Sequence, residues 1–150
     1  MMRTCILAAL IASHLGGCAL QPKYGNFVAN QHEITTVLID DTIRQLESLY
    51  PPANTKFSLG QRIAKKDMFG TGLVEALRRE GYAVQEYQDQ QQIPDGTALN
   101  YVIDNPVKGD QGLYRIKLLA GNDLLSRAYI DDGKGILAPA GAWARMEGYQ

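Results

Sequence analysis

The sequence has 150 residues, 45% of them hydrophobic, and a formal net charge of −1. This is enough chain for one domain with a buried core. The near-neutral charge gives no basic excess for nucleic acid, so no direct nucleic-acid binding is expected. No apolar run approaches the roughly 20 residues of a membrane-spanning helix, so attachment to a membrane needs another device.

Residues 1–17 have the pattern of a bacterial signal peptide. Arg3 supplies a short positive start, and residues 5–12 form an apolar stretch of typical length for such a peptide. The next four residues, 15–18, read Leu-Gly-Gly-Cys and resemble the lipobox of bacterial lipoproteins. The pattern predicts cleavage between Gly17 and Cys18, with diacylglycerol and an N-acyl chain then attached to Cys18.

The alternative is an ordinary secretory signal with an incidental cysteine. The position of Cys18 directly after a signal-length apolar stretch favours the lipoprotein. Ala19 follows the cysteine where an aspartate would indicate retention at the inner membrane, so we expect the periplasmic face of the outer membrane. Two or three acyl chains make such an anchor essentially permanent.

Residues 18–32 are predicted to be the lipidated N-terminus and a flexible tether, and residues 33–150 one globular domain. Residues 19–31 show no period and contain Pro22 and Gly25. Fully extended, they would reach roughly 40 Å at about 3.3 Å per residue.

Two helices are expected first in the domain. Apolar residues at helical spacing predict one over 33–49, with Ile39, Ile43 and Leu46 on its buried stripe and two prolines ending it. The second is predicted over 68–80, with Asp67 as its N-cap and Gly81 after its end.

The period then changes to two, which predicts strands. A short strand is also expected between the helices, at 55–59. Later strands are predicted at 82–87, 99–104, 113–120, 124–130 and near 142–147, with a polar loop at 88–96 and a turn at 107–112. The order predicts an α+β fold in which two helices pack on one face of a small, mainly antiparallel sheet.

The sequence shows no reaction centre. His32 is the only histidine after the signal peptide and is expected to be solvated, so no zinc cluster or histidine-paired nucleophile is predicted. Asp40 and Asp41 are read as part of a polar helix face. The 131–133 segment, Asp-Asp-Gly, suggests calcium weakly and a hairpin turn more strongly.

Two further features have competing interpretations. Gly70-Thr71-Gly72 lacks the rest of any phosphate-binding motif, so these glycines are read as sites of close helix packing. Trp143 is read first as a core residue; near Arg145, it is also a candidate protein interface, because both residue types are enriched there.

Several segments resemble the TrbH family of conjugative plasmids. They are the lipobox, 24–27 (Tyr-Gly-Asn-Phe), 49–53 (Leu-Tyr-Pro-Pro-Ala), 81–84 (Gly-Tyr-Ala-Val), 113–116 (Leu-Tyr-Arg-Ile), 126–129 (Ser-Arg-Ala-Tyr) and 138–143 (Ala-Pro-Ala-Gly-Ala-Trp). The resemblance implies a lipoprotein of a mating-pair formation apparatus, a type IV secretion system, placed at the outer membrane beside other channel subunits. It implies no catalytic residues; only the lipidated cysteine is carried over, onto Cys18.

Three functions remain open at this point. The first is a structural lipoprotein of a conjugative secretion apparatus, with the membrane and channel subunits as partners and no small-molecule substrate or cofactor. The second is a general envelope lipoprotein that assists an outer-membrane complex or binds a small ligand. The third is a periplasmic enzyme that works with carboxylates alone. It is the least favoured, because no inward-facing acidic pair stands out.

Overall fold

The computed structural model describes residues 23–28, 32–88, 95–107 and 112–149. The predicted signal peptide, its cleavage site and Cys18 lie outside the described residues. So do most of the polar loop predicted at 88–96 and of the turn predicted at 107–112.

The described chain forms two helices and eight strands. In chain order they are β1 (Gly25–Asn26), α1 (His32–Leu49), β2 (Lys56–Leu59), α2 (Met68–Arg79), β3 (Ala83–Gln85), β4 (Thr97–Asp104), β5 (Leu113–Ala120), β6 (Asp123–Asp131), β7 (Leu137–Pro139) and β8 (Ala144–Met146), with a 3-10 turn at Pro52–Asn54. The predicted α+β class is confirmed.

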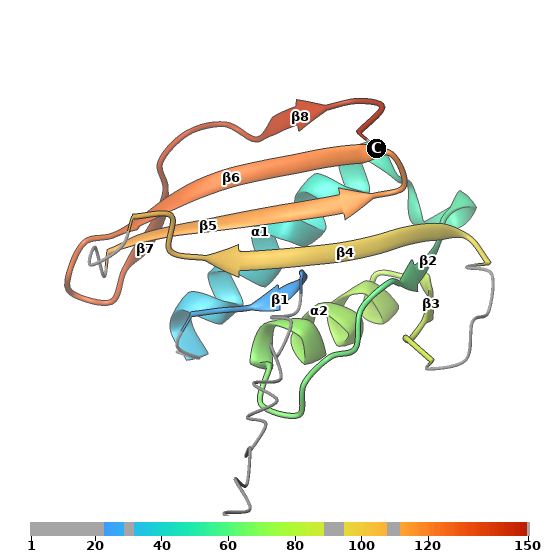
Figure 1. Cartoon of the computed structure of the whole chain (residues 1–150), viewed down its shortest axis with the longest axis horizontal. Helices are drawn as coiled ribbons and strands as arrows, with labels where there is room; N and C mark the ends of the chain where they lie inside the picture. Colours follow the sequence, from blue (N-terminus) through green and yellow to red (C-terminus); the bar gives the residue numbers. More distant parts are fainter. Residues whose placement is uncertain (1–22, 29–31, 89–94, 108–111, 150) are drawn as a thin grey trace, which may run out of the picture.

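The strands form one mixed, mostly antiparallel sheet with the order β3-β2-β4-β5-β6-β7 (Figure 1). β4, β5 and β6 form an antiparallel meander at its centre. β1 and β2 pair in parallel with β4, at different ends of it. On the other side of the meander, β7 and β8 pair in antiparallel fashion with different ends of β6. Each outer edge of the β4–β5–β6 meander is therefore covered by two short strands in place of one long strand.

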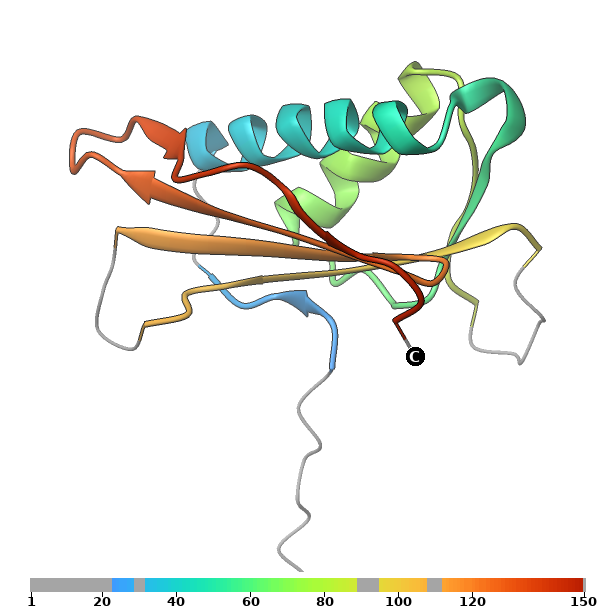
Figure 2. The ribbon, with the colours of Figure 1, turned by 90° about the horizontal axis from the view of Figure 1, so that it is seen from above.

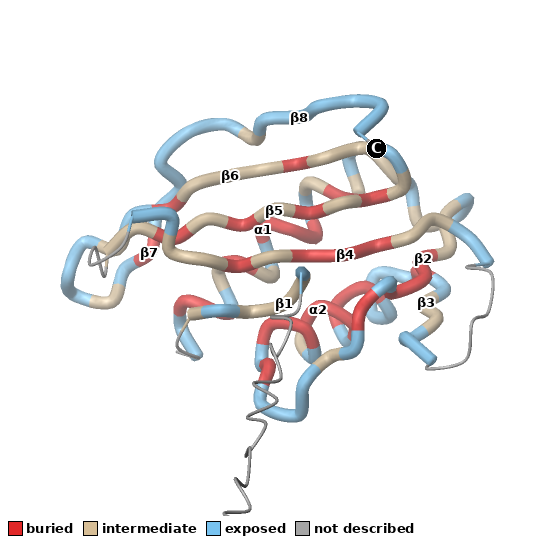
Figure 3. The backbone as a smooth tube through the Cα atoms, in the orientation of Figure 1, coloured by how far each residue is buried: buried red, intermediate tan, exposed pale blue. Residues whose placement is uncertain are grey.

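Both helices lie on the same side of the sheet, and none of the described residues forms a helix on the opposite side (Figure 2). The core is sandwiched between the helices and the sheet, where the buried segments of β4 and β5 face α1 and α2 (Figure 3). Alternation in β5 fixes this arrangement, because Tyr114, Ile116, Leu118 and Ala120 are buried and the residues between them are not. The structure thus has a helix-covered face and an open face.

α1 begins and ends close to the predicted positions. Of the expected stripe, Ile43 and Leu46 are buried against the sheet and Ile39 is partly buried; Leu38 beside it is also buried. Pro51 and Pro52 follow directly and cannot continue the helix. Tyr50 just beyond the last turn packs edge-on against Phe57 of β2, so the end of α1 is held to the sheet.

α2 confirms three local predictions. Asp67 caps its N-terminus by accepting a hydrogen bond of 3.0 Å from the backbone N–H of Gly70. Gly81 adopts a φ of 90°, which is the region that favours glycine after a helix. Gly70 and Gly72 lie where an added Cβ would meet Tyr101 and Ile39 respectively, so the two glycines do allow close packing.

Two parts of the sheet differ from expectation. Residues 19–31 were expected to be a tether, yet Gly25 and Asn26 form β1, and the N–H of Phe27 donates to the carbonyl of Ile103 at 2.8 Å. The strand β7 was not predicted at all. Both are two or three residues long and lack an alternating pattern, so only their pairing with β4 and β6 defines them.

Asp41 also corrects a prediction. It was assigned to the polar face of α1, but it is buried, whereas its neighbour Asp40 is exposed. Its burial depends on residues of β6, which the sequence of the helix does not reveal.

Candidate docking face

The open face is formed by the side chains of β4, β5 and β6 that point away from the helices. The register places them in rows across the three strands: Asn100 beside Leu119 and Leu124, and Val102 beside Lys117 and Ser126. A third row begins with Asp104 beside Arg115. We use "open face" for these residues together with Ile130 and with Met146 of β8, which pairs with Leu124.

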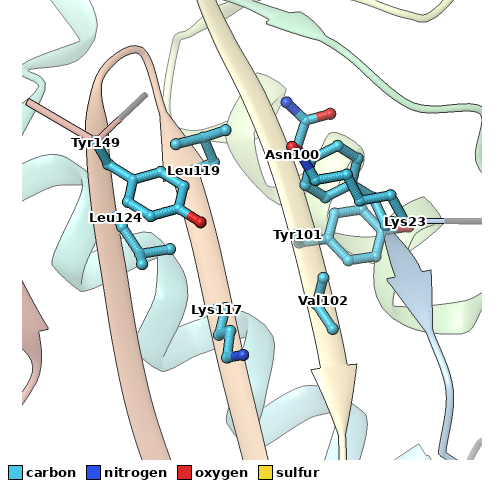
Figure 4. Close-up of a pocket in the computed structure, with 9 residues that line it drawn as sticks. Lys23, Asn100, Tyr101, Val102, Lys117, Leu119, Leu124 and Tyr149 are labelled. Atoms are coloured by element: carbon cyan, nitrogen blue, oxygen red, sulfur yellow. The ribbon is translucent and has the colours of Figure 1, made fainter.

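A hollow of about 180 Å³ lies on the open face between residues from both ends of the described chain. Figure 4 shows Tyr149, Leu124, Leu119 and Lys117 on the side of β5 and β6, and Lys23, Asn100 and Val102 on the side of β4. Tyr24 also lines it, and the ammonium of Lys23 lies 5.3 Å from the centre of the Tyr24 ring. Strands β4–β6 form the floor, and the two chain ends form the walls.

The floor of the hollow holds an unsatisfied polar atom. Asn100 is only 7% exposed, and its Oδ1 has no hydrogen-bond donor among the described residues. A buried acceptor left without a donor costs about 1–3 kcal/mol. That oxygen has almost no exposed surface, so its missing donor is a cost within the fold and gives the hollow no acceptor.

Some charged side chains on the open face form ion pairs and others do not. Arg115 donates two hydrogen bonds to Asp104, of 2.9 and 2.6 Å, so this pair is internally neutralised. Lys117, in the next row, belongs to none of the ion pairs found among the described residues. The hollow consequently has two cations, Lys23 and Lys117, and no lining carboxylate.

The helix-covered face carries its own polar cluster, centred on Asp41. Its carboxylate accepts hydrogen bonds from Arg127 at 2.8 Å and from the hydroxyl of Tyr129 at 2.6 Å, both on β6. Burial alone would raise the pKa of Asp41, but the Tyr129 hydroxyl and the Arg127 guanidinium outweigh it and lower the pKa below its usual value. The cluster joins α1 to β6.

A second buried carboxylate, Asp67, joins α2 to β4. Besides capping the helix, it accepts a hydrogen bond of 2.5 Å from the hydroxyl of Tyr101, whose backbone N–H donates to Gln61. Burial first, and then the bond to Asp67, raise the pKa of Tyr101 well above its usual value. Asp41 and Asp67 are thus bonded to tyrosines of different strands, and each connects a helix to the sheet.

Trp143 and Arg145, the candidate interface residues, lie on the segment that covers the edge of β6. Trp143 is partly buried against the core, and the guanidinium of Arg127 lies 6.0 Å from its ring centre. Arg145 donates to Asp123 at 2.9 Å, and Tyr50 donates to the same carboxylate at 2.5 Å. These contacts give Trp143 and Arg145 roles in packing, and their role as an interface stays a prediction.

The remaining sequence candidates have local explanations. His32 is exposed at the start of α1. Asp131 and Asp132 accept hydrogen bonds from backbone N–H groups of their own turn, which confirms the turn interpretation. No group of three potential metal ligands occurs among residues 23–28, 32–88, 95–107 and 112–149. In the same ranges no helix is long and apolar enough to span a membrane.

The hollow was not predicted from the sequence. The alternation within β5 leaves Arg115 and Lys117 on the face opposite the buried residues. Lys23, Asn100 and Tyr149 carried no such signal, because they reach the hollow from segments far apart in the chain.

Comparison with known proteins identifies one family. A family model described as "Conjugal transfer protein TrbH" matches residues 21–147, which is most of the chain. No curated protein matches, and neither does any solved structure.

Proposed function

The chain belongs to the TrbH family of conjugal transfer proteins, and from this premise we propose that it is an outer-membrane lipoprotein of a mating-pair formation apparatus. The family match carries the proposal, because it covers all but the last two described residues and implies a role in conjugative transfer. We further propose that the protein has a structural role in a type IV secretion system, in which it binds other channel subunits.

The anchor in this proposal is lipid on Cys18. The family match begins at residue 21, just after the proposed cleavage site, so the matched region is what cleavage would leave intact. The lipobox pattern at residues 15–18 and the alanine at 19 support lipidation and outer-membrane sorting. Holding the domain at the membrane is the mechanism: the lipid fixes position, and the domain presents surfaces to neighbouring subunits.

The experiment that tests the anchor is the Cys18→Ser variant. We expect it to lose lipid labelling, to leave the outer-membrane fraction and to lower plasmid transfer by at least tenfold. Cys5→Ser, which changes the other cysteine within the predicted signal peptide, is the matched control and should behave as the unchanged protein. A Cys18→Ser protein that still fractionates with the outer membrane and supports normal transfer would refute the mechanism.

The alternative is a general envelope lipoprotein that binds a small ligand, which the hollow would make physically feasible. The two proposals differ in what deletion of the gene does. Loss of transfer with intact growth and envelope integrity supports the transfer apparatus. An envelope defect in cells without the other transfer genes supports the alternative. Sustained turnover of peptidoglycan by the purified protein would instead indicate an enzyme.

A further inference from the structure

The link between the proposed lipid and the folded domain is short. Lys23 lines the hollow and β1 is paired with β4, so only residues 18–22 remain between the acylated cysteine and the sheet. Five residue steps span at most about 18 Å at about 3.3–3.6 Å each. This replaces the roughly 40 Å expected when residues up to 31 were taken as a tether.

That length limits what fits between the open face and the bilayer. The headgroup region of one leaflet is about 5–8 Å thick, so about 10 Å of the link remains beyond it. One α-helix with its side chains is already about 10–12 Å across, and a folded domain is larger. A folded partner therefore has no room between the membrane and the hollow beside Lys23.

The orientation follows from where Lys23 lies. It lines the hollow on the open face, and both helices lie on the opposite side of the sheet (Figure 2). Since Lys23 is where the link joins the described domain, the open face is the side that a short link brings nearest to the membrane.

The chemistry of the open face suits a phospholipid surface. Lys23 and Lys117, which line the hollow, can donate to headgroup phosphates. Tyrosines, here Tyr24 and Tyr149, are enriched where protein meets headgroups. Met146 and Ile130, which are 58% and 53% exposed, add apolar area on the same face.

We propose that the open face lies flat on the membrane, with phospholipid headgroups entering the hollow between Lys23, Lys117 and Tyr149. The inference rests on the proposed lipidation of Cys18. It leaves the helix-covered side and the edge of β6 with Trp143 turned toward the periplasm, where other subunits have access.

The test measures which side of the domain contacts headgroups. Processing removes Cys5 and acylates Cys18, so an introduced cysteine is the only free thiol. The purified lipoprotein is reconstituted into vesicles of phosphatidylethanolamine and phosphatidylglycerol. A fluorophore is attached at Met146→Cys on the open face or, as the control, at Ser48→Cys on the exposed side of α1. Quenching by a headgroup nitroxide lipid is then compared.

We expect quenching at position 146 to exceed that at position 48 several-fold. Equal quenching at both positions, or stronger quenching at 48, would overturn the orientation. Flotation with the vesicles and the mass of the acylated N-terminus are measured on the same samples. A protein that carries no lipid refutes the proposed function, whereas one that floats without the contrast refutes this inference alone.

Headgroup binding in the hollow is tested by neutralising its two lysines. The double variant Lys23→Gln/Lys117→Gln should reduce the contrast several-fold, because each cation near an anionic surface contributes about 1 kcal/mol, or roughly fivefold. Lys65→Gln, an exposed cation beside α2, should leave the contrast unchanged. An equal effect of both variants, or no effect of the double variant, would refute the proposed headgroup site.

A photo-reactive residue in place of Leu119 tests the occupant in cells. We expect crosslinks to phospholipid. Crosslinks to a channel subunit or to a second copy of the chain would instead show that protein covers the open face and would overturn the proposal.

Discussion

At the scale of single residues, the most informative contact joins positions 86 apart in the sequence. Arg127 and Asp41 form an ion pair of 2.8 Å, with side chains only 19% and 8% exposed. Arg127 also donates to the carbonyl of Gly141 at 2.8 Å and lies over the ring of Trp143. One guanidinium thus connects α1, β6 and the segment that leads to β8.

We expect Arg127→Met to lower the free energy of unfolding by about 2–4 kcal/mol. The methionine fills much of the space, but it leaves the Asp41 charge buried with only Tyr129 and the exposed Arg44 as partners. Urea unfolding of the mature Cys18→Ser chain, followed by circular dichroism, measures the change.

Arg115→Met on the open face is the matched control. Its partner Asp104 is 26% exposed and can be solvated when the arginine is removed, so the expected loss is about 1 kcal/mol or less. Equal losses in the two variants would show that the Asp41 cluster has no special part in holding α1 to the sheet.

At the scale of elements, α2 shows how local sequence serves tertiary packing. Glycine is a poor helix former, yet α2 contains two of them in its first two turns. Gly70 lies against the hydroxyl of Tyr101, which Asp67 holds in place, and Gly72 lies against the flexible end of Ile39. The first neighbour is fixed, and the second can move.

Gly70→Ala is therefore expected to destabilise the domain by about 1–3 kcal/mol, although alanine favours the helix by about 1 kcal/mol. The added methyl has to displace Tyr101 and weaken its bond to Asp67. Thermal unfolding followed by circular dichroism checks the result. Thr71→Ala, at the exposed position between the glycines, should be neutral or slightly stabilising. If Gly70→Ala were as stable as Thr71→Ala, the close-packing explanation would be wrong.

At the scale of the whole molecule, two carboxylates make stability depend on pH. Hydrogen bonds lower the pKa of Asp123, first from Tyr50 and then from Arg145, and the Tyr129 and Arg127 contacts lower that of Asp41 despite burial. A carboxylate whose pKa is lower in the folded state contributes stability above its unfolded pKa, near 3.8, and loses it as pH falls through the folded value.

The free energy of unfolding should consequently change little from these two groups between pH 5 and 7 and fall below about pH 4. Urea titrations at a series of pH values measure it. In Asp41→Asn the protein should be less stable at neutral pH, with a shallower decline in acid. A decline as steep as that of the unchanged chain would assign the acid sensitivity to other groups.

The sequence by itself determined the type and position of most elements. Helical spacing, two prolines, an aspartate cap and a glycine after the helix define α1 and α2, because these signals act within a few residues of one another. Strict alternation determined β5 and its buried face, since a strand places neighbouring side chains on opposite sides. The pattern that predicts a lipobox around Cys18 is equally local, and the lipidation stays a prediction.

The tertiary structure alone decided what depends on partners distant in sequence. β1 and β7 exist only through pairing with β4 and β6, and Asp41 is buried only because Arg127 and Tyr129 compensate its charge. The hollow combines Lys23 with Tyr149, from opposite ends of the described chain. The physical reason is the same in each case. These features are stabilised by contacts between segments distant in sequence. The pattern within one segment does not predict which other segment it contacts.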